Sequence, residues 1–575
     1  MPAPTSSSVA SSPALGLVLG LGLALAPVAC GDDASSTSAS SATTSGDTST
    51  GGDTSTGTTS GGGTTSGGTT SGGATETEAT GGTQASTSGS GGETGELPPL
   101  DAWPARRGVL HVHSPFSHDA CDGEGLMNGV PNQGCKADLR AAICATGFDF
   151  VLLTDHPSFM EDYPFDQLLL SEAGDAPILD GDAPIANRVT CPNDHEVLLA
   201  VGYESTHTLP LGLHHHVAAE FYAGLTDGEP LADSSALVAA LQAAGAVVGI
   251  AHSEEDDLSA GRIIDVGLDA MEWYNPHGNF KTALGGDSIG GDPTAVLDLL
   301  KGLLPFMAGS DSGAHPDLVY LHLLPAWPVE GFAKWREVLR SRPITGLFGS
   351  DVHQNVRVDP ICVQDNQILQ AACIAAAEAV LPEALVGLVS GGTLTMADGE
   401  RLDSYGRVFR WLENRVLVDP RAPLDLEAIQ GSLRAGRSYG LFSVFGDPEG
   451  FAYVAEAGGE TFQIGEALAP PFTLHLQAPT LPAPLTPAGP QWSPEEGAAA
   501  SIRAVLVHTD GGGSEEIAEL DALGDRLDHE VSAAGAYHVE VWVRPGHLKG
   551  ALGSQDQLAD VEYLWIISNP IYALP

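Results

Sequence analysis

The chain of 575 residues contains few basic side chains. Lys and Arg together number 24 against 74 Asp and Glu, which gives a formal net charge of −50. A surface of this sign repels the phosphate backbone of nucleic acids and anionic membrane surfaces, so we expect no nucleic-acid partner. An anionic substrate would need local positive charge, and bound metal ions can supply that charge.

A hydrophobic run long enough to span a bilayer is also missing from the start of the chain. The apolar run at residues 15–26 is too short, and small residues and then Cys30 follow it. The segment 1–30 resembles a bacterial lipoprotein signal, although Pro27 and the absence of Lys and Arg before the run are unusual. We expect an extracytoplasmic protein, periplasmic or on the cell surface, that meets the membrane through a lipid anchor only. Ordinary cleavage and secretion is the alternative.

Cysteine is scarce, and no CxxC spacing indicates a thiolate metal site. Setting Cys30 aside leaves six of the seven cysteines, and an even number in an exported chain suggests disulfides. Sequence alone does not fix their connectivity. The pairing that joins near neighbours first is Cys121 with Cys135, Cys362 with Cys373, and Cys144 with Cys191.

Apolar periodicity is absent from residues 35–95, which are almost entirely Ser, Thr and Gly. Such a segment cannot bury a core, so residues 31–98 should form a disordered, solvated linker. Branched and aromatic residues return from Trp103 onward. We therefore place the start of the folded part at about residue 99.

A repeating unit follows, in which a helical pattern ends at a glycine and an apolar strand comes next. Residues 138–145 and 234–244 have the helical pattern, and the second is expected to begin at Ser234 or Asp233. Alternation of helix and strand predicts a parallel sheet in an α/β domain over 99–440. The predicted strands are 108–112, 148–153, 197–201, 246–251, 270–274 and 344–348.

The pattern changes near residue 441. After a last predicted helix at 424–433, apolar and polar residues alternate between Gly- and Pro-rich stretches. This is typical of antiparallel strands, and we expect a C-terminal β-sandwich-like domain over 441–575. Its clearest predicted strands are 472–476, 502–507 and 537–543.

Histidines and carboxylates stand at the ends of nearly all the strands predicted in the α/β region. In a parallel α/β barrel these ends share one face, so the side chains should converge. Neutral imidazoles and carboxylates are the ligands that Zn, Mn and Fe use. One HxH pair alone would mean little, but the whole series predicts a metal site: His111 and His113, Asp155 and His156, Glu204, His252, and Asp351 and His353.

The order of these motifs resembles the polymerase-and-histidinol-phosphatase (PHP) superfamily of metal-dependent phosphoesterases. The resemblance covers about residues 107–437 and implies a distorted (β/α)7 barrel that holds two or three divalent metal ions, Zn, Mn or Fe. EWYN at 272–275 and WIISNPIY at 565–572 resemble the exported CehA/McbA branch, which includes carbaryl hydrolase. The motifs that carry the main resemblance are LHVHS (110–114), SHD (117–119), LTDH (153–156), GYE (202–204), HHH (214–216), AHS (251–253) and GSDVH (349–353).

The resemblance also implies a ligand set. A first metal would be held by His111, His113, Glu204 and Asp351. Glu204 would bridge it to a second metal, bound by His215 and His252, and the cluster would be completed by His118, His156 and His353. Asp119 is the alternative to His118, while His216 and then His214 are the alternatives to His215.

Such a cluster predicts hydrolysis. A water between two metals loses a proton near neutral pH and attacks phosphorus or a carbonyl, and Asp155 or His353 would move protons. No Ser/His/Asp or Cys/His arrangement is discernible in the sequence, which disfavours a nucleophilic enzyme. We expect an exported phosphoesterase with a small-molecule ester substrate. The alternatives are a carbamate or carboxylic ester hydrolase with the same metals, and a metal-stabilised surface binding protein without activity.

Overall fold

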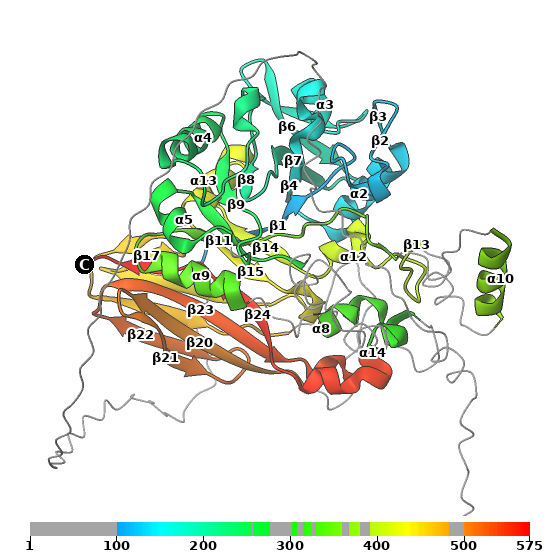
Figure 1. Cartoon of the computed structure of the whole chain (residues 1–575). Helices are drawn as coiled ribbons and strands as arrows, with labels where there is room; N and C mark the ends of the chain where they lie inside the picture. The colour runs from blue at the N-terminus through cyan, green and yellow to red at the C-terminus, as the bar shows by residue number, and fades with distance from the viewer. Residues whose placement is uncertain are drawn as a thin grey trace, which may run out of the picture. The chain divides into compact units, whose positions relative to one another are not determined.

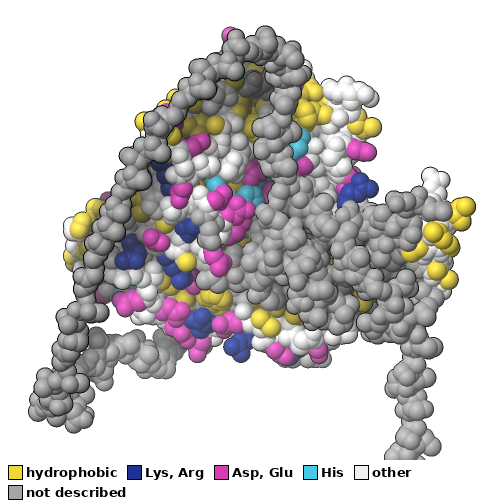
Figure 2. Space-filling model, in the orientation of Figure 1, with side chains coloured by type: hydrophobic (Ala, Val, Ile, Leu, Met, Phe, Trp, Pro, Cys, Tyr) yellow, Lys and Arg dark blue, Asp and Glu magenta, His cyan; other side chains and the backbone are white. Residues whose placement is uncertain are grey.

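Figure 1 shows the computed structural model of the chain, which describes residues 100–255, 257–276, 302–307, 314–323, 329–358, 367–379, 392–481 and 499–575. The predicted signal, Cys30 and the Ser/Thr/Gly linker lie outside these ranges. Among the described residues, no helix has the length and apolar character needed to cross a bilayer. Acidic side chains outnumber basic ones on the face seen in Figure 2, in keeping with the net charge of −50.

One large mixed sheet forms the centre of the described chain. Thirteen strands join in it, and its main path is β18-β25-β23-β24-β15-β14-β1-β4-β7-β6-β5. The pairs β1–β4 and β4–β7 are parallel, whereas β14 joins β1 antiparallel. The mixed α/β class is therefore confirmed. The strands from its N-terminal part are β1 (Ala105–Val112), β4 (Phe150–Asp155), β5 (Ala176–Asp180), β6 (Ala183–Thr190), β7 (Glu196–Tyr203), β14 (Glu413–Leu417) and β15 (Ser438–Leu441).

Both helix–strand units predicted from the sequence are present. Helix α2 (Gln133–Thr146) starts where the Asn132 side chain accepts hydrogen bonds from two backbone amides, and it ends at Gly147 with a φ of 65°. Helix α4 (Leu231–Ala243) begins earlier than expected, at Pro230 as N-cap. The predicted cap at Ser234 or Asp233 is wrong, because Ser234 lies inside the helix and its hydroxyl donates to the Pro230 carbonyl.

Four further strands complete a circuit with the N-terminal part of the large sheet. Strand β8 (Thr208–Leu211) runs antiparallel to β9 (Val247–Ile250), and β10 (Ala270–Tyr274) runs parallel to β11 (Thr345–Phe348). Backbone hydrogen bonds join the residues flanking these strands to their neighbours. Leu213, after β8, donates to Val201 of β7, and Asp269, before β10, donates to Val248 of β9. After β11, Ser350 N donates to Leu110 O and Asp351 N to His111 O, both of β1. The carboxyl ends of β1, β4, β7, β9, β10 and β11 thereby come together.

Antiparallel strands dominate the C-terminal region, as predicted. The strands expected at 472–476, 502–507 and 537–543 are β19 (Phe472–Gln477), β20 (Ser501–Asp510) and β23 (Gly535–Arg544). A separate four-stranded antiparallel sheet consists of β17 (Glu460–Gln463), β16 (Ala452–Ala457), β19 and β22 (Arg526–Val531). The large sheet continues through β20, β21 (Gly513–Leu520), β23, β24 (Tyr563–Ser568), β25 (Ile571–Ala573) and β18 (Ala467–Leu468).

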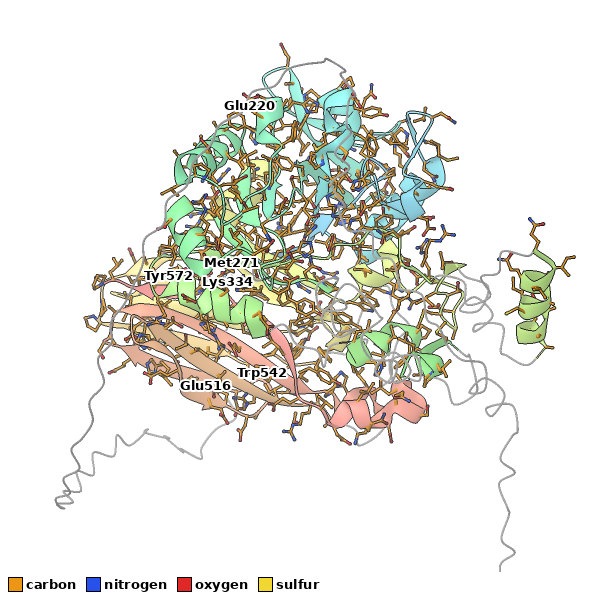
Figure 3. The ribbon with its side chains drawn as sticks, viewed as in Figure 1. Glu220, Met271, Lys334, Glu516, Trp542 and Tyr572 are labelled. Carbon is orange, nitrogen blue, oxygen red and sulfur yellow. A yellow bond between two sulfur atoms is a disulfide. The ribbon has the colours of Figure 1, made fainter. Side chains whose placement is uncertain are left out.

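Side-chain contacts join the two sheets of the C-terminal region to one another and join neighbouring strands of the large sheet. Tyr453 of β16 donates its hydroxyl hydrogen to the Tyr537 carbonyl of β23, at 2.8 Å, and so links the two sheets. On β20, Arg503 pairs with Glu516 at 3.2 Å and lies 5.7 Å from the ring centre of Trp542; Figure 3 labels these two partners. No strand of the four-stranded sheet contributes to the convergence of strand ends described above.

Helices pack around the N-terminal part of the large sheet (Figure 1). Helices α4 and α5 lie on one side of the N-terminal part in Figure 1, and α2 and α3 on the other. The elements not yet located are β2 (Leu126–Met127), β3 (Val130–Pro131), α3 (Phe165–Leu168), α5 (Ala260–Val266), α8 (Val319–Leu323), α9 (Val329–Leu339), β12 (Arg357–Val358), α10 (Gln367–Glu378), β13 (Gly392–Thr393), α12 (Tyr405–Phe409), α13 (Leu426–Arg434) and α14 (Lys549–Leu552).

Disulfides follow the predicted pairing where the structure describes both partners. Cys121 bonds to Cys135 and Cys144 to Cys191, which confirms two of the three pairs. Cys373 is disulfide-bonded as well, and its predicted partner Cys362 lies outside the described residues.

Candidate metal centre

Side chains from five separate strand ends and one loop converge at one place. Two groups of ligand atoms form there, and within each group all the atoms lie within 4.8 Å of one another. His113 belongs to both groups. The first group is His111, His113, Glu204 and Asp351, and the second is His113, Asp119, His156 and His353. His252 adjoins the first group, with Nε2 at 2.9 Å from Glu204 Oε1.

The backbone is bent at several of these positions. His111, His252 and Asp351 have φ values of 54°, 51° and 51°, in the left-handed region that β-carbon-bearing residues rarely adopt. The register between β1 and β4 shifts between Leu110 and Val112, so His111 sits at an irregularity in its strand. Residues held this way cost on the order of 1–3 kcal/mol each, and such strain gathers at functional sites.

The nitrogen–oxygen distances in the first group match those of a tetrahedral cation site. His111 Nε2 lies 3.1 Å from Glu204 Oε2 and 3.2 Å from Asp351 Oδ1. His113 Nε2 lies 3.2 Å from each of the same two oxygens. Four ligands about 2.0 Å from a zinc ion stand about 3.3 Å apart at the corners of a tetrahedron. The Nε2 atoms of His111 and His113 are buried without a hydrogen-bond partner, which also suits a metal.

The hydrogen-bond partners of His111, His156 and His353 fix which ring nitrogen carries a hydrogen. Nδ1 of His111 lies 2.6 Å from Glu272 Oε1, and Nδ1 of His156 and His353 face the carbonyl oxygens of Glu204 and Asp351 at 3.2 and 2.9 Å. Because these oxygens only accept, each Nδ1 carries a hydrogen and donates. The neutral ring then presents a lone pair at Nε2. All three Nε2 atoms face carboxylates, so the arrangement requires a second proton on each ring or a cation between.

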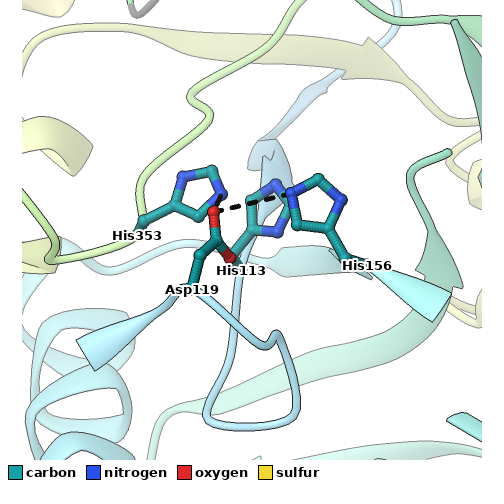
Figure 4. A group of neighbouring side chains, drawn as sticks. All are labelled: His113, Asp119, His156 and His353. Carbon is teal, nitrogen blue, oxygen red and sulfur yellow. Dashed lines mark ion pairs between the residues drawn. The ribbon is translucent and has the colours of Figure 1, made fainter. Parts of the chain in front are cut away.

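The second group is organised around Asp119 (Figure 4). Its Oδ2 lies 3.2 Å from His353 Nε2 and 3.6 Å from His156 Nε2. The rings of His113 and His353 are stacked, with centres 3.6 Å apart. Asp119 thus contacts His156 and His353, two of the histidines that the sequence assigned to the cluster. It occupies the ligand position for which His118 was the first candidate.

Electrostatics of the cluster reflect the burial of unlike charges together. Burial lowers the pKa of His111, but Glu204, Glu272 and Asp351 outweigh it and raise that pKa well above its ordinary value. Burial would raise the pKa of Glu204, and His111 and His252 instead hold it well below the usual range. The pKa of His156 is raised to about 10, because Asp119 and Glu204 outweigh its burial. Without metal, the imidazoles must carry the positive charge.

His113 differs from its neighbours. Burial, together with the nearby His353, lowers its pKa to about 4, although the carboxylates of Asp351 and Glu204 lie close by and favour the protonated ring. A ring that resists protonation keeps its Nε2 lone pair available over a wide pH range. As the residue shared by both groups, His113 is therefore the best-prepared metal ligand of the cluster.

Asp155, the predicted proton-transfer residue, is held by Ser114. It accepts hydrogen bonds from the Ser114 amide at 2.5 Å and the Ser114 hydroxyl at 2.7 Å, and burial raises its pKa to about 6 despite these bonds. Asp155 belongs to neither ligand group. His353, the other predicted proton-transfer residue, lies in the second ligand group. Their roles in proton transfer stay predictions.

The structure does not bring His215 to the cluster. Strand β8, which precedes the HHH triplet, is antiparallel to β9, and its last residue, Leu211, pairs with Val247 at the start of β9. The triplet therefore lies near the start of β9, whereas His252 follows the end of that strand. His215 is exposed, and its Nδ1 lies 2.8 Å from the His216 carbonyl. His214 contacts Gln430, while His216 contacts the Tyr222 hydroxyl and the Tyr163 carbonyl. His118 lies beside the cluster, its ring centre 5.0 Å from that of His156, but it is in neither group.

Sequence reasoning left two buried side chains near the cluster without an assigned role, Glu272 and His207. Glu272 holds His111 through Oε1 and accepts a hydrogen bond from the His252 amide through Oε2 at 2.8 Å. The EWYN motif was the signal for it. His207 is buried at the cluster-facing end of β8, with Nε2 at 2.6 Å from Asp257 Oδ1, and no pattern in the sequence marked it.

A pocket lined in part by Asp351 and His353 opens beside the cluster. Aromatic side chains, including Tyr274, Tyr320 and Trp411, form part of its lining. The rings of Tyr320 and Trp411 are stacked at 4.7 Å, and the Tyr320 hydroxyl donates to that of Tyr274 at 2.6 Å. The cavity offers an apolar and aromatic surface to the organic part of a ligand that reaches the cluster.

Comparisons with known proteins add little to this geometry. No protein-family model and no curated protein matches the chain. A two-domain protein from Bacteroides vulgatus, described as containing a predicted PHP-like metal-dependent phosphoesterase, is similar to the chain with 12% sequence identity and a TM-score of 0.28, over 82% of this chain and 97% of that one. A likeness of this strength assigns neither fold nor activity.

Proposed function

We propose that this chain is a metal-dependent hydrolase of phosphate esters, with a PHP-type metal centre in a distorted (β/α)7 barrel and a β-sandwich-like C-terminal region. One observation carries the proposal: among the described residues, the buried carboxylate of Glu204 forms ion pairs only with histidines, namely His111, His113, His156 and His252. A buried carboxylate with no permanent cation beside it is costly unless a metal compensates it.

Bound divalent cations, Zn, Mn or Fe, would activate a water and stabilise charge on the scissile group. His111, His113 and Asp351 would hold one cation together with Glu204, whose other oxygen faces His252. Asp119, His156 and His353 would hold another, which assigns to Asp119 the place first considered for His118. Asp155, with a pKa of about 6, is suited to accept or return a proton near neutral pH.

The EWYN motif supports the narrower proposal of the exported CehA/McbA branch. Glu272 contacts two predicted ligands, and Asn275 donates a hydrogen bond to Asp351 Oδ2 at 3.2 Å. Both side chains are buried at the cluster. The motif therefore sits where a branch-specific part of a metal centre would be expected.

The aromatic cavity favours a second candidate function, hydrolysis of carbamates or carboxylic esters. Its described lining includes Tyr274, Tyr320 and Trp411. Such a surface suits an uncharged organic group, and a cation polarises a carbonyl as well as a phosphoryl oxygen. In both candidates the substrate is a small-molecule ester, and the two differ in whether the cation polarises a phosphoryl or a carbonyl oxygen.

Metal analysis and a substrate panel test both candidates together. Purified protein is analysed for Zn, Mn and Fe and assayed with p-nitrophenyl phosphate, a phosphodiester, an acetate and a carbamate, before and after removal of metal by a chelator. Metal-dependent turnover of the phosphates supports the first candidate, and turnover of only the acetate or carbamate supports the second. Bound metal without turnover of any substrate would leave a metal-stabilised binding protein, and absence of metal would overturn all three.

We further propose an extracytoplasmic lipoprotein. The disulfides Cys121–Cys135 and Cys144–Cys191 support it, since such bonds persist in oxidising compartments. Replacing Cys30 with Ala should move the protein out of the membrane fraction. Unchanged membrane association of the variant would rule out an anchor at Cys30.

A further inference from the structure

The strand that leads to Asp351 and His353 is bordered on one side by side chains instead of a backbone ladder. On its other side, β11 pairs in parallel with β10, with Thr345 and Leu347 in register with Ala270 and Glu272 before the register shifts at the end of the pair. In an extended strand, alternate residues direct their N–H and C=O groups to opposite sides. Gly346 and Phe348 therefore direct theirs away from β10.

Two buried asparagines occupy that side. The Gly346 amide donates to Asn569 Oδ1 at 2.7 Å, and Asn569 Nδ2 donates to the Gly346 carbonyl at 3.0 Å. The Phe348 amide donates to Asn414 Oδ1 at 2.9 Å, and Asn414 Nδ2 donates to the Phe348 carbonyl at 2.8 Å. A carboxamide offers one acceptor and a donor in the arrangement of a peptide group. The two side chains thus satisfy all four backbone groups that a neighbouring strand would satisfy.

This support ends where the metal centre begins. Directly after β11, the Gly349 amide donates to the Tyr274 carbonyl, and the Ser350 and Asp351 amides donate to β1 at Leu110 and His111. Asp351 has left-handed backbone there, at a φ of 51°. A residue in such a conformation stays in place only when the surrounding structure holds it. The position of β11 therefore decides where the Asp351 carboxylate lies.

Asn569 comes from the far end of the chain. It follows β24 and is 223 residues from Gly346 in sequence. It is also fixed on its own side, because its amide and its Nδ2 both donate to the Ser438 carbonyl at 3.1 Å, and Nδ2 also lies 2.9 Å from Ser438 Oγ. The C-terminal strands and β15 thereby set the position of the carboxamide that holds β11.

We propose that Asn569 is a positioning residue of the metal centre: it holds β11 by imitating a strand neighbour, and so makes the C-terminal region a required part of metal binding. The inference rests on the proposed function in so far as the cluster binds metal. Asn569 itself touches no ligand. Asn414 does the same for Phe348 from β14, inside the α/β region.

A matched control exists in the same region. Gln463 is a buried carboxamide that also imitates a strand neighbour, since it accepts from the Trp103 amide at 2.9 Å and donates to the Asp101 carbonyl at 3.0 Å. Its partners precede β1 and lead to no ligand directly. Gln463→Ala therefore removes the same kind of contact from the same C-terminal region, without touching β11.

The experiment compares Asn569→Ala with Gln463→Ala and the unaltered protein. Metal affinity is measured by competition with a chelator, and amide exchange of residues 344–353 is measured by mass spectrometry on the metal-free protein. Asn569→Ala should weaken metal binding by about 10- to 100-fold, the range for groups that orient ligands, and accelerate exchange in 344–353. Gln463→Ala should change neither. Unaltered affinity and exchange in a folded Asn569→Ala protein would overturn the proposal.

Two further outcomes are kept separate. If Asn569→Ala does not fold, Asn569→Asp replaces it, because the aspartate still accepts from Gly346 but cannot donate to its carbonyl. Reduced affinity in that variant supports the proposal, and full affinity contradicts it. If the unaltered protein binds metal but hydrolyses no ester, the proposed function fails while the affinity comparison remains valid. If it binds no metal, unchanged exchange in 344–353 would still refute the role of Asn569.

Discussion

Two regions of this molecule each gather several carboxylates, and they differ in what faces them. One is the candidate metal centre around Glu204 and Asp351. The other, the arginine network, consists of Asp317, Asp398 and Glu400, whose oxygens also lie within 4.8 Å of one another. Here Arg407 pairs with Asp317 and with Asp398 at 2.5 and 2.8 Å, and Arg410 pairs with Asp317 and Glu400 at 2.8 and 2.7 Å.

The two regions differ in whether the charge of the basic partner depends on pH. A guanidinium keeps its charge at every pH of interest, so the arginine network is compensated by the chain itself. An imidazole is charged only when it holds a second proton, and His113 resists that proton because burial lowers its pKa to about 4. Without metal, the buried carboxylates are balanced only by protons on imidazoles such as His111, His156 and His252, whose pKa values are raised, and a cation from outside can take the place of those protons. The kind of partner, more than the number of acidic groups, distinguishes a metal site from a structural ion-pair network.

Breaking the metal centre at its shared carboxylate should have the largest effect. Glu204→Gln keeps the shape of the side chain and removes the charge that faces four histidines. Most of the bound metal should be lost, and kcat/KM should fall by ~100-fold or more, since even groups that only orient ligands are worth 10- to 100-fold. Asp398→Asn, the matched change in the arginine network, should leave metal content unaltered. Metal loss in Asp398→Asn instead would reverse the comparison.

A smaller effect is expected from the group that orients His111. Glu272→Gln replaces the acceptor that faces Nδ1 of His111 with an amide. The ring should lose its fixed tautomer and part of its basicity, so metal affinity should fall by about 10- to 100-fold with the ligands intact. Chelator competition measures the change. An affinity equal to that of the unaltered protein would show that Glu272 has no part in holding the ligand.

The smallest effect on metal should come from the arginine network, where the effect on stability is large. Arg407 is fully buried, and Arg407→Met leaves Asp317 with one guanidinium fewer. Loss of one partner of a buried pair costs about 3–5 kcal/mol of unfolding free energy, and the lower part of that range applies because Asp398 and Glu400 are partly exposed. Denaturant unfolding should show this loss. Chelator competition should show no change in metal affinity, and a change there would mean that the two regions are coupled.

Much of the metal centre was predictable because parallel strands align their ends. Strand patterns located β1, β4, β7, β9 and β11, and the ligands His111, Glu204 and Asp351 follow directly from where those strands end. His215 was assigned by the family resemblance alone, and the structure does not bring it to the cluster. The strand before it, β8, runs antiparallel to β9, and nothing in the local sequence around Leu211 reveals strand direction.

Contacts between distant segments were beyond the reach of local patterns. Asn569 is set beside Gly346 by the pairing of β24 with β15, a relation that no spacing in a single sequence records. Asp119 was named only as an alternative to His118, because the family resemblance left open which residue of the SHD motif would be the ligand. Glu272 stood in a recognisable motif, but its contact with His111 depends on β11 lying between β10 and β1 and bringing the two strands close.

The most direct test of the central claim is to locate the metal. Crystals of the protein prepared with Zn²⁺ or Mn²⁺ would be measured at the absorption edge of the ion, and anomalous difference maps would mark its position. The account predicts one peak within bonding distance of His111, His113, Glu204 and Asp351, and a second beside Asp119, His156 and His353. Peaks confined to Asp317, Asp398 and Glu400, or a histidine cluster without a peak in metal-saturated crystals, would contradict it.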